Sequence, residues 1–156
     1  MKTLEEITYD AGRAALDDQE KLVAGIRQRT GTLLAAHALV ASFLGATTIR
    51  ATGLSPWTWI ALVALVLGLV AAAVLLAPRN LTFAVGAAEL YSALRGPAAE
   101  EAEAGTLAWL VAAAYSYETL AKANAPRVDS MSRLLTALAM LMVAQTLSWL
   151  TGLAVD

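Results

Sequence analysis

The chain lacks cysteine and contains a single histidine, His37, among its 156 residues. Without cysteine there is no disulfide, no thiolate nucleophile and no cysteine-based metal site, and one histidine does not make a histidine cluster. Charged residues make up 15% of the sequence, against roughly 25% in typical soluble domains, whereas hydrophobic residues reach 58%. The sequence also has no glycine-rich phosphate loop and no nucleophile elbow. We therefore expect a membrane protein that is not an enzyme and that carries no metal and no cofactor.

Three long stretches of the sequence are apolar and almost free of charge. They cover about residues 31–49, 58–77 and 134–154, and each is long enough to cross the ~30 Å hydrocarbon core as a helix. Between the first two stretches, a tight turn is expected at Gly53, Ser55 and Pro56. The sequence thus predicts an all-α membrane protein with three transmembrane helices.

Lysine and arginine residues are distributed unevenly around these stretches. Ten of the eleven lie before the first stretch or between the second and the third, and only Arg50 lies elsewhere. Cytoplasmic loops carry such an excess of cations in membrane proteins. We expect the N-terminus in the cytoplasm and the C-terminus outside. Twelve of the thirteen acidic residues share the cytoplasmic side, so the cations are not a general nucleic-acid footprint.

We treat residues 1–156 as a single domain with four parts, which are a long cytoplasmic helix (1–30), a helical membrane hairpin (31–78), cytoplasmic helices (79–132) and the third membrane helix (133–156). Thr3 and Glu6 form a capping-box pattern that predicts the start of the first helix. An apolar stripe is expected to bury one face of that helix, through Leu4, Ile7, Ala11, Ala15, Leu22 and Ile26.

The cytoplasmic section is expected to form a helical hairpin. Residues 81–95 have an amphipathic pattern, and the Gly96–Pro97 pair should end that helix. A second helix should continue to about residue 123 and end at Pro126, after which Asp129 or Ser130 can cap the last helix.

Two of the spans carry polar stripes at helical spacing, whereas the second span lacks one and is expected to face lipid. One interpretation is that the stripes line a pore and that His37 gates it or senses pH. The other is that small and hydroxyl residues hold the helices together, with His37 bonded to a neighbouring carbonyl. The pore-lining candidates are Thr30, His37, Ala41, Gly45, Thr48, Thr136, Gln145 and Ser148.

Five arginines are expected near the cytoplasmic membrane surface, namely Arg27, Arg29, Arg79, Arg127 and Arg133. They either anchor the topology on lipid headgroups or form a basic ring that binds an anionic nucleotide, because the guanidinium fork suits phosphate. Nearby aromatic residues can stack on bases, although an amphipathic helix would bury such residues anyway. These aromatic residues are Tyr91, Trp109, Tyr115 and Tyr117.

The sequence that enters the first span reads Arg27-Gln28-Arg29-Thr30-Gly31-Thr32-Leu33-Leu34-Ala35-Ala36, followed by Ala41-Ser42-Phe43-Leu44-Gly45. With the long polar N-terminal helix and the tight pair of spans, this layout resembles small bacterial transmembrane effectors of anti-phage defence. SLATT-domain proteins, Pycsar transmembrane effectors and the Hailong effector belong to this group, and the third span fits the latter two better. The resemblance implies a homo-oligomer in the bacterial inner membrane, controlled by a cytoplasmic nucleotide or oligonucleotide.

Two functions follow as hypotheses. The first is an oligomeric effector or ion channel, a tetramer or a similar small ring, gated by that nucleotide signal. The resemblance then implies a nucleotidyltransferase or cyclase encoded nearby. The second is a non-conducting membrane adaptor that recruits a cytosolic partner through its cytoplasmic helices.

Overall fold

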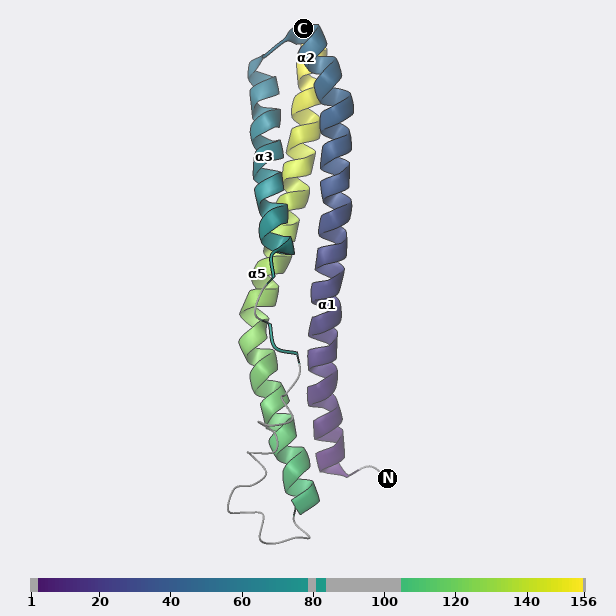
Figure 1. The fold of residues 1–156 in the computed structure, drawn as a ribbon, viewed down its shortest axis with the longest axis vertical. Helices are drawn as coiled ribbons and strands as arrows, with labels where there is room; N and C mark the ends of the chain where they lie inside the picture. Colours follow the sequence, from purple (N-terminus) through teal and green to yellow (C-terminus); the bar gives the residue numbers. More distant parts are fainter. Residues whose placement is uncertain (1–2, 79–80, 84–104, 156) are drawn as a thin grey trace. The chain divides into compact units, whose positions relative to one another are not determined.

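The computed structural model in Figure 1 describes residues 3–78, 81–83 and 105–155. Within these ranges all regular secondary structure is helical, so the all-α prediction is confirmed for this part of the chain. In chain order the elements are α1 (Leu4–Val40), the π-helical turn η1 (Ala41–Gly45), α2 (Ala46–Thr52), α3 (Pro56–Leu76) and α5 (Gly105–Val155).

Three helical stretches of the described chain are long and apolar enough to cross a membrane. They are Glu6–Thr52, Pro56–Leu76 and Trp109–Val155. Each predicted span falls on one of these stretches. The prediction of three helices long and apolar enough to span a membrane is therefore confirmed for the described residues.

The first helix begins where the capping box predicts. The Thr3 backbone N–H donates to Glu6 Oε2 at 2.9 Å, and the Glu6 N–H donates to Thr3 Oγ1 at 3.3 Å. Helical structure then continues from Leu4 to Thr52 through α1, η1 and α2. The N-terminal cytoplasmic helix and the first span of the prediction are thus parts of one helical stretch.

The turn after α2 is also where the sequence predicts it. Gly53 has φ +71°, a conformation that side-chain-bearing residues rarely adopt. Ser55 caps α3, because its side chain accepts a hydrogen bond from the Thr58 N–H at 3.4 Å. Pro56 occupies the first helical turn, where its missing N–H costs nothing.

The predicted helix end at Pro126 is wrong. Helix α5 runs through Pro126, so neither Asp129 nor Ser130 starts a new helix. An interior proline removes one backbone hydrogen bond and costs about 3 kcal/mol. Val128 and Met131 are buried just beyond it. Burial of side chains of this size contributes about 1.5–3 kcal/mol each, enough to offset the loss.

The predicted cytoplasmic helix over residues 81–95 is described only at its start. Leu81–Phe83 are not helical, and residues 84–95 lie outside the described part of the chain. The carbonyl of Thr82 accepts a hydrogen bond from the buried Asn124 Nδ2 at 2.8 Å. This bond ties the segment after α3 to α5.

The chain divides into two compact units. Unit 1 consists of Met1–Val23 and Arg79–Asp129, and unit 2 consists of Ala24–Pro78 and Ser130–Asp156. Helices α1 and α5 contribute residues to both units, whereas α3 belongs to unit 2 alone.

In unit 1 the buried face of α1 differs from the predicted stripe, although Ile26 of that stripe is only 3% exposed in unit 2. Leu16 and Val23 are almost completely buried, whereas Leu4 is 75% exposed and Leu22 is 50% exposed. Leu16 and Val23 are seven residues apart, the repeat by which two helices keep one seam in contact. The predicted stripe follows the average helical period instead and drifts off this seam.

Unit 2 brings together parts of the three helical stretches that are long and apolar enough to span a membrane. The face of α3 that is buried consists mainly of small residues, which let helix backbones approach closely. They are Ala61, Ala64, Gly68, Ala71 and Ala72, with Leu75 at the end. The outer face of α3 is bulky and apolar, with Trp59, Ile60, Val63, Val66, Leu67 and Val70 exposed. The interior of unit 2 also contains buried polar residues, which include His37 and Gln145.

Candidate functional site

His37 lies at the centre of unit 2 and is only 1% exposed. Its Nδ1 atom is hydrogen-bonded to Gln145 Oε1 on α5. Its Nε2 atom lies 3.4 Å from the carbonyl oxygen of Leu138, two turns before Gln145 on the same helix face. Gln145 is fully buried, and its Nε2 donates to the His37 carbonyl at 3.5 Å. These contacts join the first and third spans through a polar pair inside an apolar bundle.

The third wall of the His37 site is Gly68 on α3. A Cβ atom at this position would lie 3.0 Å from His37 Cε1 and 3.1 Å from His37 Nε2, so any larger residue would press on the ring. Both ring nitrogens face oxygen atoms, and a neutral imidazole has one N–H with which to satisfy them. The ring is therefore held in one orientation by three helices. This contact with a neighbouring carbonyl is the one expected by the packing interpretation.

A second polar cluster in unit 2 surrounds Trp149, which is 1% exposed. Its indole packs on Gly45, where a Cβ would lie 3.2 Å from Cζ2. The Thr48 hydroxyl donates to the Leu44 carbonyl at 2.8 Å and lies 3.4 Å from the Trp149 carbonyl. A Cβ at Gly152 would lie 3.1 Å from the Thr48 methyl group. Glycine on each helix thus makes room for a large or branched residue on the other.

Most of the predicted pore-lining residues are engaged inside one protomer. Ala41 is half-buried and Thr136 is exposed. The other six are buried, namely Thr30, His37, Gly45, Thr48, Gln145 and Ser148. The Thr30 and Ser148 hydroxyls donate to carbonyls of their own helices at 2.8 Å. To line a pore, the buried six would have to leave these contacts. Their role as pore lining stays a prediction.

Thr136, the exposed candidate, shares a surface groove with one of the predicted arginines. The groove has a volume of about 450 Å³ and is lined by Arg29, Thr32, Leu33, Leu135, Thr136 and Ala139. The Thr32 and Thr136 hydroxyls donate to carbonyls one turn back on their own helices, at 3.3 and 3.1 Å. Sequence reasoning missed Thr32, although its position one turn after Arg29 places both on one face of α1.

The five predicted arginines do not all fall within one described body. Arg27, Arg29 and Arg133 belong to unit 2, where Arg27 is half-buried and the other two are exposed. Arg127 belongs to unit 1, and Arg79 lies outside the described residues. The basic ring therefore stays a prediction.

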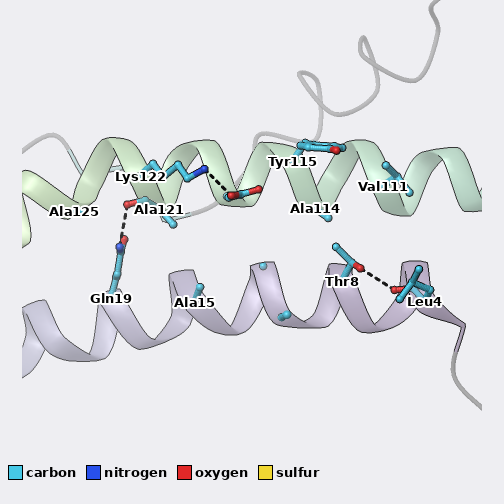
Figure 2. Close-up of a pocket in the computed structure, with 13 residues that line it drawn as sticks. Leu4, Thr8, Ala15, Gln19, Val111, Ala114, Tyr115, Ala121, Lys122 and Ala125 are labelled. Atoms are coloured by element: carbon cyan, nitrogen blue, oxygen red, sulfur yellow. Dashed lines mark hydrogen bonds and ion pairs between the residues drawn. The ribbon is translucent and has the colours of Figure 1, made fainter.

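Unit 1 contains a larger, mainly apolar groove between α1 and α5, shown in Figure 2. Its volume is about 710 Å³, and much of its lining is Ala or Gly, including Ala11, Gly12, Ala15, Ala114, Ala121 and Ala125. The Gln19 amide nitrogen crosses from α1 to α5 and donates to the Ala121 carbonyl at 3.0 Å, as Figure 2 shows. Glu118 and Lys122 form a 2.6 Å ion pair on the same groove, but both are well exposed, so the pair adds little stability.

Three aromatic side chains pack together on unit 1. The Tyr9 ring lies 5.7 Å from the Trp109 ring and 5.6 Å from the Tyr117 ring, the latter edge-on. Burial, followed by a hydrogen bond with Tyr9, raises the pKa of Tyr117 above its ordinary value of 10.0, so the phenol stays protonated at neutral pH. Trp109 and Tyr117 are therefore used in packing, whereas Tyr115 is 67% exposed and Tyr91 lies outside the described residues.

Comparison with known proteins returned no relative. No protein-family model, no curated protein and no solved structure matched the chain. Within the described ranges, no three His, Asp or Glu side chains are placed to hold a metal ion. What the chain does is therefore inferred below from the geometry of the two units.

Proposed function

We propose that the chain is the subunit of a small oligomeric ion channel in a bacterial inner membrane, controlled by a cytoplasmic nucleotide or oligonucleotide. The observation that carries this proposal is the uneven exterior of unit 2. One membrane-spanning segment shows large apolar side chains to its surroundings, and another shows small residues. If every face of the protomer contacted lipid, we would expect large apolar side chains on all of them.

The exterior of α3 suits lipid, because its exposed residues are tryptophan, isoleucine, valine and leucine. The first span instead exposes small residues at spacings of three and four, namely Gly31, Ala35, Ala38, Ser42 and Ala46. We call this set the small-residue face. Leu39 and Phe43, which follow Ala38 and Ser42 in the chain, are also exposed, so larger apolar side chains border the face.

Small residues at helical spacing let a neighbouring helix approach closely, which favours a second protomer against this face. The Ser42 hydroxyl donates to the Ala38 carbonyl at 2.8 Å, so it needs no partner outside its own helix. With this face towards its neighbours, each protomer presents α3 to lipid. The groove of Arg29, Thr32 and Thr136 then offers hydroxyls and a cation to an ion path or to an anionic signal.

The direct test of conduction is ion flux across liposomes that contain the purified protein. Flux of potassium or chloride should appear or disappear when nucleotides or short oligonucleotides are added. No flux under any of these conditions would refute the channel.

The oligomer can be tested separately, because the chain has no cysteine of its own. A single Ala38→Cys substitution on the small-residue face should give disulfide-linked dimers in membranes. The matched control is Val66→Cys on the exposed face of α3, which should remain monomeric. Equal crosslinking of both positions would mean random collisions rather than a defined interface.

A second function, the membrane adaptor, is favoured by the groove of unit 1. Its length along about four turns of each helix and its Ala-rich lining suit the apolar face of a helix from a cytosolic partner. Filling the groove with Ala15→Trp should then abolish co-purification of that partner. Glu20→Trp, on an exposed position that does not line this groove, should leave it unchanged.

A further inference from the structure

The π-helical turn η1 displaces the buried seam of the first span by one residue. Up to this turn the buried positions Thr30 and His37 follow a seven-residue repeat. The same repeat would next bury Leu44. The structure instead buries Gly45 against Trp149 and leaves Leu44 half-buried. The π-turn acts like a one-residue insertion, the known effect of such turns within α-helices.

Threonine hydroxyls bond to backbone carbonyls at this turn. A π-turn disturbs the regular backbone ladder, so a side-chain donor can reach a carbonyl there. The Thr48 hydroxyl donates to the Leu44 carbonyl at 2.8 Å. The Thr47 hydroxyl lies within reach of two carbonyls at once, 3.0 Å from that of Phe43 and 2.9 Å from that of Leu44. Because the Thr47 hydroxyl can donate to either carbonyl, it can bond to the backbone in both a π-helical and an α-helical form of this turn.

We propose that η1 is a register switch between two states of the first span. In the observed state the turn is π-helical and Gly45 lies under Trp149. In the second state residues 41–45 are α-helical. Removing the extra residue from the turn rotates α2 by about 100° and moves it about 1.5 Å along the axis. Leu44 then replaces Gly45 opposite Trp149, and the indole has to move.

The switch would let α2, at the outer end of the first span, rotate while the His37 site stays in place. His37 is held by Gln145, Leu138 and Gly68, all on neighbouring helices. Beyond η1, Thr48 of α2 contacts the Trp149 carbonyl and the small Gly152 on α5. The proposal does not require the protein to conduct ions, so it stands or fails independently of the channel.

The test uses two nitroxide labels in the full chain in lipid nanodiscs. The labels are placed on Ile49→Cys in α2 and Val63→Cys in α3, both exposed positions of unit 2. Pulsed electron–electron double resonance should show two distances between the labels in this parent protein. Deletion of Leu44 puts Gly45 seven residues after His37 in an uninterrupted α-helix, and it should leave one distance. A single distance in the parent that the deletion does not change would overturn the switch.

Two further variants keep the test decisive. Deletion of Ala35, an exposed residue between Thr30 and His37, shifts His37 out of its site and should lower the melting temperature much more than deletion of Leu44. If deletion of Leu44 itself prevents folding, Gly45→Ala serves instead. Its Cβ would crowd Trp149 in the observed state only, so the share of the second distance should rise several-fold. An unchanged share would also overturn the proposal.

Discussion

The packing of His37 against Gly68 makes a prediction in which two physical effects oppose each other. In Gly68→Ala, the new Cβ lies 3.0 Å from the imidazole, which cannot easily move because Gln145 and Leu138 hold it. In Gly25→Ala, at a glycine of unit 2 outside the small-residue face, the new Cβ meets nothing within 4 Å. The same chemical change is therefore made at one crowded and one open position of the same unit.

The magnitudes decide the sign at each position. Replacing Gly with Ala inside a helix contributes about 1 kcal/mol of stability. Overpacking a rigid site costs about 1–3 kcal/mol. Gly25→Ala should therefore stabilise the protein by about 1 kcal/mol. Gly68→Ala should be neutral or destabilising by up to about 2 kcal/mol, and the difference between the two variants isolates the packing cost at the imidazole.

The assay is equilibrium unfolding of the purified protein in mixed micelles, with the free energy of unfolding measured for both variants. His37→Ala in the Gly68→Ala background should remove the clash, so the double variant should lose less than the sum of the single losses. Equal stabilisation by both glycine substitutions would show that the imidazole does not rest on α3, and the description of the site would fail.

Three further predictions concern contacts elsewhere in the two units. Gln145→Leu leaves a His37 nitrogen without a partner and should destabilise by about 1–2 kcal/mol, and a double-mutant cycle with His37 that shows no coupling would contradict the bond. Pro126→Ala restores a backbone donor in α5 and should stabilise by about 1–3 kcal/mol in thermal unfolding; a loss would mean that α5 requires the proline. Tyr9→Leu removes two aromatic pairs and should cost about 1–3 kcal/mol, whereas an unchanged melting temperature would show that the cluster adds no stability.

Helix positions were predictable wherever one local signal decided them. The capping box at Thr3 and Glu6 and the turn at Gly53, Ser55 and Pro56 are local in this sense, and the structure confirms them. At Pro126 the local signal misled. Proline stops a helix only when nothing beyond it stabilises continuation, and the burial of Val128 and Met131 is a tertiary effect.

The buried face of each helix was harder to predict than the helix itself. The first helix has apolar residues on several sides, and the choice of Leu16 and Val23 over Leu4 and Leu22 depends on which neighbour it meets. The meeting of His37 with Gln145 joins residues separated by 108 positions, a separation that no local pattern encodes.

Apolar length was enough to predict three helices that are long and apolar enough to span a membrane, because suitability for hydrocarbon is a property of each segment alone. The tertiary structure decided that His37 and Gln145 meet inside unit 2, because a buried imidazole or amide is costly unless a hydrogen-bond partner satisfies it, and here that partner lies on another helix. It also decided where the π-turn falls. That turn brings Gly45 rather than Leu44 against Trp149, a contact that exists only when the two helices are packed together.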